Sequence, residues 1–314
     1  MDNVTSLPHD SENILRLAQV AIEEQDFEKA ITLLQHSLTQ KSTMDVSITL
    51  ILLYIDLHRL EDAKDIWEGH MDYSQLENFP IFLKEWLKHL PNIYAPTELV
   101  EELSDLLGYL TPSTEIAQQT QSLLIESLSK STNLKKIAKG NHASLIQECI
   151  NKDPIELLTF LKDVYREVTP QTPIFLKKLL LVESLGNYIC SDILHFLIRQ
   201  KDKDAINTSW FGQEITVKLD QLTPYHQSPA YQANLQAIKD YFGSHDPHLL
   251  TDAIQQFQFH ALIFYPYIDD ILLDDDSWLR AFRTLYLMED VTPVSQDLIN
   301  YVQQANIELM QLYK

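Results

Sequence analysis

A helical pattern that repeats after 33 residues, near the start of the chain, constrains the fold more than any other feature of the sequence. Residues 11–41 carry apolar side chains at helical spacing on both sides of a break at Gln25, which predicts a helical hairpin. Residues 46–67 repeat this plan, and Ala30 and Ala63 then occupy equivalent positions 33 residues apart. A fixed period of this length, built from paired helices, is typical of a stacked repeat array.

These two units resemble tetratricopeptide (TPR) repeats. The small residues Ala30 and Ala63 open the second helix of each unit, where they permit close helix approach, and the larger Phe27 and Leu60 precede them. The units depart from the family pattern in lacking its early Trp, and Ser42 stands where a repeat-ending Pro is usual. The resemblance implies an all-α, TPR-like superhelix of stacked helical hairpins that holds a peptide or helix of a partner protein.

In the TPR family the first helix of each repeat lines the binding groove. The resemblance therefore implies a groove formed by eight residues of this chain: Leu15, Gln19, Ile22, Glu23, Ile48, Leu52, Ile55 and Asp56. These residues are mainly apolar and acidic, so they favour an apolar or basic amphipathic segment. They disfavour a terminal carboxylate, which the chaperone-binding TPR class grips with basic side chains. The alternative interpretation is that the same apolar residues only pack against the next repeat.

Helices are expected through most of the remaining chain. The predicted segments are 79–90, 97–109, 113–128, 131–139, 142–151, 154–167, 173–186, 189–200, 228–242, 247–264, 276–288 and 293–312. Pro91 is expected to end the first of them. Because no repeat register is evident in the middle of the chain, we divide it into N-terminal repeats (11–90), degenerate helical repeats (91–200) and a C-terminal region (201–314).

One segment departs from the helical pattern. Residues 206–210 and 215–219 alternate apolar and polar side chains on either side of the turn Phe211-Gly212-Gln213, which predicts one small β-hairpin near 206–219. A lone hairpin is only marginally stable, so we expect a helix to cover its apolar face.

A further resemblance covers most of the chain. Three segments are similar to the C-terminal region of uncharacterised TPR-containing proteins from Gram-positive bacteria: Thr172–Leu180, Trp210–Val217 and Phe259–Pro266. This resemblance implies no reaction, because that group has no established activity to carry over.

Glycine is scarce, and this argues against several enzyme classes. The chain has 6 Gly in 314 residues, about 2% against a usual value of about 7%. Phosphate-cradling loops and nucleophile elbows need Gly, and the sequence contains no P-loop, GxGxxG or GxSxG motif. Cys149 and Cys190 lack zinc-site spacing and are expected to be buried thiols. We therefore assign no catalytic residue, metal ligand or cofactor and expect a non-enzymatic protein.

The charge balance disfavours nucleic acid as a partner. Lys and Arg number 24 against 45 Asp and Glu, so the net charge is −21, which repels a phosphate backbone. It favours a neutral or basic protein partner instead. Residues 1–10 lack the basic and apolar regions of a signal peptide, and the apolar run Ser47–Leu57 is too short to span a membrane. These features predict a cytoplasmic protein without membrane attachment.

Several polar clusters leave alternatives open. The acidic run Asp269–Asp276 offers carboxylates for a divalent cation, but it lacks EF-hand spacing, and a solvated turn that caps the next helix through Asp275, Asp276 and Ser277 is simpler. His245 and His248 could ligate a metal or act as a base, although Asp246-Pro247 between them more simply marks a helix start.

Three further features of the sequence also have alternative interpretations. The basic side chains of Lys130, Lys135, Lys136 and Lys139 could contact phosphate or an acidic partner, or could form a solvated helix face. His260 is expected to be a satisfied core or boundary residue. Residues 173–219 follow the helix, helix, wing order of a winged-helix DNA reader, although the would-be recognition helix Ser191–Arg199 is mostly apolar. A nucleic-acid-binding regulator and an enzyme with a non-contiguous carboxylate or histidine site remain alternatives to the scaffold.

Overall fold

The computed structural model describes residues 11–40, 43–289 and 291–312. The predictions made at residues 1–10 and at Ser42 lie outside these ranges. Contacts group the chain into two compact units, here called the N-terminal unit (1–132) and the C-terminal unit (133–314). The described residues are mostly helical, with one two-stranded antiparallel sheet, as expected for the predicted class. The predicted superhelix and the three-part division of the chain stay predictions.

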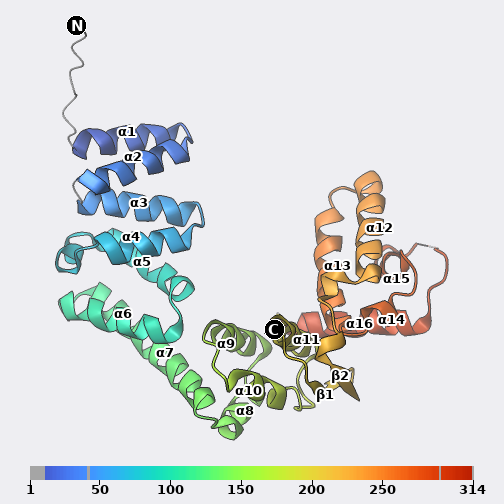
Figure 1. The fold of residues 1–314 in the computed structure, drawn as a ribbon. Helices are drawn as coiled ribbons and strands as arrows, with labels where there is room; N and C mark the ends of the chain where they lie inside the picture. The colour runs from blue at the N-terminus through green and yellow to red at the C-terminus, as the bar shows by residue number, and fades with distance from the viewer. Residues whose placement is uncertain (1–10, 41–42, 290, 313–314) are drawn as a thin grey trace. The chain divides into compact units, whose positions relative to one another are not determined.

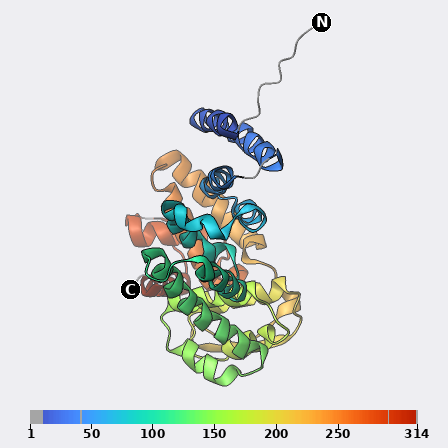
Figure 2. The same cartoon turned by 90° about the vertical axis from the view of Figure 1, so that its left-hand side faces the viewer.

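The N-terminal unit begins with four helices that pack in chain order. They are α1 (Ser11–Glu23), α2 (Phe27–Gln40), α3 (Met44–Asp56) and α4 (Leu60–His70). Each packs against the next, so that the first hairpin is layered on the second (Figure 1), as the view turned by 90° also shows (Figure 2). The unit continues with η1 (Tyr73–Asn78), α5 (Pro80–Ile93), α6 (Pro96–Tyr109) and the first part of α7 (Glu115–Ala138).

The backbone confirms the 33-residue period. Helices α1 and α3 begin at Ser11 and Met44 and end at Glu23 and Asp56, 33 residues apart in both cases. The residues Gln25 and His58, also 33 apart, both adopt the left-handed region, with φ of 61° and 57°.

The two turns also share their hydrogen bonds. The N–H of Asp26 donates to the carbonyl of Ala21, and the N–H of Arg59 donates to the carbonyl of Tyr54, both at 2.8 Å. Together with the left-handed residue before the donor, this bond is the Schellman closure of a helix end. The same local chemistry therefore closes the first helix of each hairpin.

Small and aromatic side chains pack the hairpins together. Ala30 and Ala63 are fully buried, as expected for residues that let two helices approach closely. The ring of Tyr54 is also buried, its hydroxyl accepts a hydrogen bond from Nε2 of Gln35 at 2.9 Å, and the Arg59 guanidinium lies 4.8 Å from its centroid. These contacts fix α2 against α3.

The carboxylate of Glu102 links α6 to α4 and η1 through hydrogen bonds. The indole Nε1 of Trp67 on α4 donates to Glu102 Oε1 on α6 at 2.7 Å, and the hydroxyl of Tyr73 on η1 donates to the same oxygen. The Trp67 ring also lies 4.9 Å from that of Trp86 on α5. The core of this unit thus continues beyond the two repeats.

Two helix boundaries in this region differ from the prediction. Pro91 lies inside α5 and does not end it: the helix runs to Ile93, and the N–H of Tyr94 still donates to the carbonyl of Leu90 at 2.9 Å. Proline removes only its own N–H, so the residues after it can complete the last turn. The predicted helices 113–128 and 131–139 form one helix, α7, in which polar side chains such as Ser127 bond the carbonyl four residues earlier.

The C-terminal unit contains more varied elements. They are α8 (His142–Ile150), α9 (Pro154–Arg166), α10 (Thr172–Leu179), α11 (Asn187–Arg199), β1 (Ala205–Trp210), β2 (Gln213–Lys218), η2 (Leu219–Gln221), η3 (Tyr225–Gln227), α12 (Pro229–His245), α13 (Leu250–Phe264), α14 (Ile268–Ile271), α15 (Ser277–Phe282), η4 (Arg283–Leu287) and α16 (Gln296–Leu312). The predicted helix 173–186 is therefore too long, because α10 ends at Leu179. The predicted helix 276–288 changes from α15 to a π-type turn at Arg283.

The predicted β-hairpin is confirmed. Strands β1 and β2 pair antiparallel from Ala205 opposite Lys218 to Trp210 opposite Gln213. The two turn residues, Phe211 and Gly212, both have positive φ, 46° and 75°, as a type I′ turn requires. Helix α11 contacts β1, which supplies the expected helical cover.

A buried histidine, His260, forms hydrogen bonds to two other elements in the core of the C-terminal unit. His260 on α13 is fully buried, and its Nδ1 accepts a hydrogen bond from Nε1 of Trp278 at 3.0 Å. Its Nε2 lies 3.2 Å from Oδ1 of Asn306 on α16 and donates to it in the neutral ring. Burial lowers the pKa of His260 to about 4, so the ring is neutral near pH 7. The prediction of a satisfied core histidine is confirmed.

Candidate functional site

The predicted groove residues lie on α1 and α3, at equivalent positions of the two hairpins. The structure describes all eight, and their exposure differs by type. The four half-buried apolar residues pack against the core of the N-terminal unit: Leu15, Ile22, Ile48 and Leu52. Ile55 is buried, with 8% exposure. The three polar residues are exposed: Gln19, Glu23 and Asp56.

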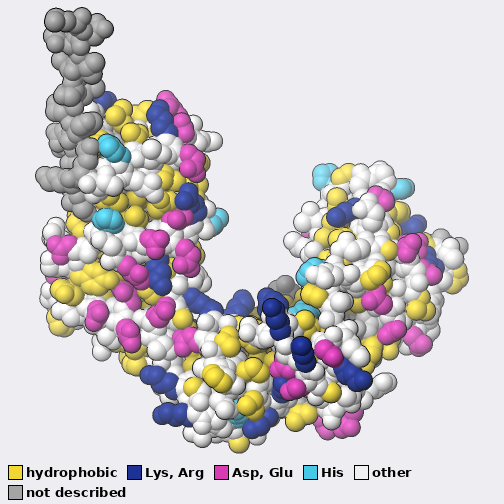
Figure 3. Space-filling model, in the orientation of Figure 1, with side chains coloured by type: hydrophobic (Ala, Val, Ile, Leu, Met, Phe, Trp, Pro, Cys, Tyr) yellow, Lys and Arg dark blue, Asp and Glu magenta, His cyan; other side chains and the backbone are white. Residues whose placement is uncertain are grey.

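Each of these two helices therefore presents a partly accessible apolar row that ends beside a carboxylate. Leu15 and Ile48 correspond to one another in the 33-residue period, as do Glu23 and Asp56. Neither Glu23 nor Asp56 forms an ion pair with a described residue. Helix α2 packs against both α1 and α3, which fixes the two rows within one unit. Figure 3 shows acidic side chains spread among apolar ones over the visible face of this unit.

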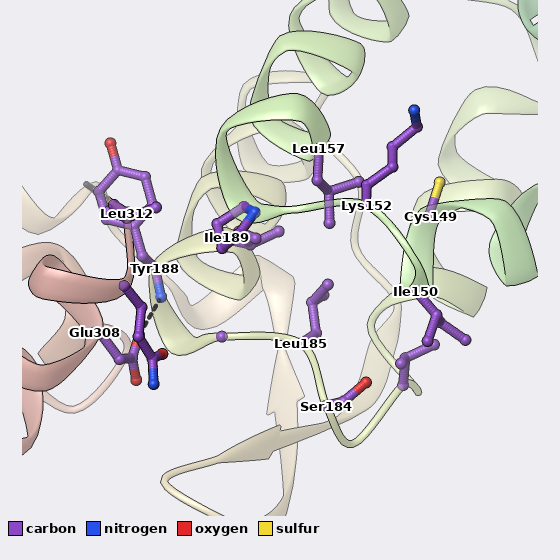
Figure 4. Close-up of a pocket in the computed structure, with 14 residues that line it drawn as sticks. Cys149, Ile150, Lys152, Leu157, Ser184, Leu185, Tyr188, Ile189, Glu308 and Leu312 are labelled. Carbon is purple, nitrogen blue, oxygen red and sulfur yellow. Dashed lines mark hydrogen bonds between the residues drawn. The ribbon is translucent and has the colours of Figure 1, made fainter. Parts of the chain in front are cut away.

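A small cavity of about 140 Å³ lies in the C-terminal unit (Figure 4). Its walls come from α8, α9, the segment that precedes α11, α11 itself and α16. They include the aliphatic side chains of Leu157, Val182, Leu185 and Ile189. In Figure 4, Glu308 lies across the cavity from Cys149, and the Lys152 side chain extends away from it. The polar groups at its edge, Glu308 and Cys149, are candidates for a chemical role.

The carboxylate of Glu308 serves as a remote helix cap. One oxygen accepts a hydrogen bond from Nδ2 of Asn187, and the other accepts from the backbone N–H of Tyr188 at 3.3 Å. Gly186 is the N-cap residue of α11 and has no side chain to perform this task. Burial raises the pKa of Glu308. The carboxylate therefore joins α16 to the start of α11, and its oxygens are already engaged.

The thiol of Cys149 is not an activated nucleophile. The side chain is buried, at 1% exposure, and burial raises its pKa to about 12. The thiolate, and not the thiol, is the reactive species, so Cys149 is inert near neutral pH. Burial likewise raises the pKa of Cys190 to about 12. The expectation of buried thiols is confirmed for both residues.

The acidic run at 269–276 is used for capping and ion pairing. Asp269 Oδ1 accepts from the hydroxyl of Ser228 at 2.6 Å and from the N–H of Ala230 at 3.1 Å. Asp274 and Asp276 both pair with Arg280, at 2.5 and 2.9 Å. The predicted side-chain cap at Asp276 is wrong, because that carboxylate reaches the guanidinium of Arg280 and makes no capping hydrogen bond.

The other polar clusters also make local contacts. The ring of His245 stacks on that of Tyr241 at 4.6 Å, and the predicted helix start at Pro247 lies in a turn, since α13 begins at Leu250. In the basic segment, Lys130 pairs with Glu126 at 2.9 Å and Lys136 with Glu148 at 3.0 Å.

Helix α11, the would-be recognition helix, has its polar side chains engaged within the C-terminal unit. The hydroxyl of Ser191 donates to the carbonyl of Tyr265 at 3.2 Å, Asp192 accepts from the hydroxyl of Tyr165 at 2.8 Å, and His195 Nε2 accepts from the N–H of Tyr225 at 3.3 Å. Arg199 is exposed at the end of the helix. A DNA-reading helix needs several free polar side chains, and this arrangement leaves few.

Two carboxylates of structural importance were missed from the sequence, Glu102 and Glu308. Each is a single charge on an amphipathic helix whose partners are distant in the chain. Their only local signal is a position beside apolar neighbours, as for Glu308 between Ile307 and Leu309.

Neither a metal-holding group of side chains nor a membrane-spanning helix is present in the described ranges. No group of three or more His, Cys, Asp or Glu side chains in 11–40, 43–289 and 291–312 gathers closely enough to hold a metal ion. None of the helices in these ranges combines the length and the apolar character needed to cross a bilayer.

Comparisons with known proteins add no relative. No protein-family model matches the chain, and neither the curated proteins nor the solved structures include a significant match. The functional argument therefore depends on the residues and their geometry.

Proposed function

We propose that the chain is a non-enzymatic interaction scaffold that holds a peptide or helix of a partner protein on its N-terminal hairpins. The observation that carries this proposal is the recurrence of two surface features at equivalent positions of α1 and α3. At equivalent positions each helix has half-buried apolar side chains, Leu15 and Ile48, and an exposed carboxylate, Glu23 and Asp56. A partner helix could place apolar side chains on these rows and basic ones beside the carboxylates.

The charge of the chain supports a neutral or basic partner. A net charge of −21 raises the encounter rate with a basic segment and lowers it with an acidic one. Because Glu23 and Asp56 have no described ion-pair partner, both are available to a partner cation. The proposal includes a cytoplasmic location, which the two free, buried cysteines support.

Affinity capture from native cytosol, with matched charge variants, tests this proposal. The double variant Glu23→Lys/Asp56→Lys reverses both carboxylates on exposed positions, so the fold should survive. We expect it to reduce recovery of the captured partner at least about tenfold, which corresponds to about 1.4 kcal/mol. The more intrusive Leu52→Asp should abolish capture.

The control changes the charge equally on another helix. Glu61 and Asp65 are exposed on α4, so Glu61→Lys/Asp65→Lys alters the net charge by the same amount outside the proposed surface. Capture should then be nearly unchanged. Equal losses in both double variants would indicate attraction by net charge alone, and normal capture by Leu52→Asp that remains folded by circular dichroism would refute the assignment to α1 and α3.

A further inference from the structure

A second cavity, of about 510 Å³, lies in the C-terminal unit and is walled by aromatic rings. Trp210 at the end of β1, Tyr267 before α14 and Tyr301 on α16 all line it. The Trp210 ring lies 4.9 Å from that of Tyr267 and 5.6 Å from that of Tyr301, measured between centroids. We call this cavity the aromatic groove. Its volume falls within the range of about 300–1,000 Å³ that is usual for small-molecule sites.

Two carboxylates complete the rim of the aromatic groove. Asp270 on α14 and Asp297 on α16 both line it and are exposed. Neither carboxylate forms an ion pair or a hydrogen bond with a described residue, unlike those of Asp269 and Asp274 nearby. No Lys or Arg is among the residues that line the cavity. The groove thus combines aromatic faces with uncompensated negative charge.

This combination has a defined chemical preference. The face of an aromatic ring carries negative electrostatic potential and attracts a cation within about 6 Å of the centroid. Carboxylates at the rim add Coulomb attraction, which is stronger beside an apolar wall than in bulk water. An alkylated ammonium has a large apolar surface for the rings and a positive charge for the carboxylates. A hydrated metal ion would lack the first of these interactions.

Helix stabilisation accounts for only part of this arrangement. Asp270 and Asp297 each lie in the first turn of a helix, where a negative charge is favourable. That effect does not require the two carboxylates to line one cavity together with three aromatic rings. Asp252, in the first turn of α13, is also exposed but does not line the groove, and it provides a matched comparison.

We propose that the aromatic groove binds an organic ammonium group, through the rings of Trp210, Tyr267 and Tyr301 and the carboxylates of Asp270 and Asp297. The ammonium comes either from a free small cation or from a lysine side chain of a peptide, and the two share the same recognition chemistry. The proposal is independent of the role given to the N-terminal hairpins.

Ligand-observed NMR titration of the full chain tests the proposal with two nearly isosteric probes. Choline carries the charge, and 3,3-dimethylbutan-1-ol has carbon in place of nitrogen. We expect choline to bind at least about tenfold more tightly than the alcohol, because only the cation gains from the rings and carboxylates. Equal binding of both probes, or binding of neither choline nor the lysine peptide described below, would overturn the proposal.

Matched variants locate the site. The double variant Asp270→Asn/Asp297→Asn should weaken choline binding about tenfold, and Tyr301→Leu should weaken it by a similar factor. Asp252→Asn should leave the affinity within about twofold of the wild type, since its carboxylate has the same helix position but lies outside the groove. Wild-type affinity in the double aspartate variant would refute the assignment even if Tyr301→Leu failed to fold.

A peptide arm distinguishes the two sources. A short peptide with one central lysine is compared with the same peptide carrying acetyl-lysine. Stronger binding of the unmodified peptide than of choline assigns the groove to a lysine side chain, and the reverse assigns it to a free cation; both results support the proposal. In either case the double aspartate variant should remove the preference for the charged form.

Discussion

In the N-terminal unit each of the first four helices packs against the next one along the chain, whereas in the C-terminal unit such neighbour contacts are supplemented by contacts between distant segments. Helix α11 (Asn187–Arg199) packs against α13 (Leu250–Phe264), and α13 packs against α16 (Gln296–Leu312). A stack of neighbour contacts can lose an end repeat and keep the rest. A core assembled from distant segments folds only when all of those segments are present.

This difference affects what each unit can present to a ligand. The hairpins repeat one surface at a fixed interval, which suits an extended peptide or helix. The C-terminal unit brings single residues from separate elements to one place, which suits a compact site such as the aromatic groove. The following predictions test the comparison, from the largest expected effect to the smallest.

Truncation should separate the two units most clearly. Removal of residues 296–314 deletes α16 with its buried Leu298, Val302 and Ala305, and with Glu308. The loss should be comparable to the whole stability of a typical domain, about 5–15 kcal/mol, so the C-terminal unit should not fold. Removal of residues 1–43 should leave α3 and the elements after it helical. Hydrogen exchange followed by mass spectrometry measures both results, and unfolding of α3–α6 on N-terminal truncation would contradict the nearest-neighbour description.

The pH dependence of stability should differ between the units because of His260. Its pKa is about 4 in the folded state and 6.5 in the reference state, so between these values the unfolded chain binds the extra proton. Stability therefore falls as the pH drops from about 6.5 to about 4, by about 1.4 kcal/mol per pH unit and about 3 kcal/mol in all.

Urea denaturation at several pH values checks this prediction. The variant His260→Gln should be less stable at pH 7 and should lose the part of the slope that His260 contributes, whereas His195, whose pKa burial also lowers to about 4, should keep its own part. His58→Gln, at an exposed position of the N-terminal unit, should keep the wild-type slope. A slope unchanged in His260→Gln would mean that another group controls the acid sensitivity.

The two half-buried carboxylates, Glu102 and Glu308, should contribute similarly to stability although they lie in different units. Glu308→Gln weakens the cap on α11, and Glu102→Gln weakens the acceptor that serves Trp67 and Tyr73. We expect each to cost about 1–2 kcal/mol, since hydrogen bonds to a charged group are stronger than neutral ones. Denaturant midpoints measure the effect, and α11 should lose exchange protection at its start only in Glu308→Gln.

The smallest effect tests the equivalence of the two repeats. Gln25 and His58 both adopt positive φ, which glycine tolerates better. Gln25→Gly and His58→Gly should each stabilise the N-terminal unit by about 0.5–1 kcal/mol, and the two effects should add. Unequal effects would show that the turns are less alike than their hydrogen bonds indicate.

Local patterns predicted local structure well. The helical hairpins, their 33-residue spacing and the β-hairpin turn at Phe211-Gly212 depend on neighbouring residues, and the structure contains all three. The prediction failed where one helix was divided into two. Separate helices were expected at 113–128 and 131–139, but α7 is continuous, and the hydroxyls of Ser127 and Thr132 bond carbonyls within it.

Features made by distant residues could not be predicted in this way. Glu308 caps a helix that begins 121 positions earlier, at Asn187, and nothing in the local sequence of either residue indicates the pairing. The aromatic rings of the groove come from three places: β1, the segment that precedes α14, and helix α16. The predicted partner-binding residues share helices α1 and α3 because they were derived from a repeat, and their role stays a prediction.

Hydrogen exchange on the complex with the captured partner tests the scaffold proposal most directly. The account predicts that partner binding slows exchange in α1 (Ser11–Glu23) and α3 (Met44–Asp56), and that Glu23→Lys/Asp56→Lys removes this protection. Protection absent from both helices, in a complex that forms normally, would contradict it.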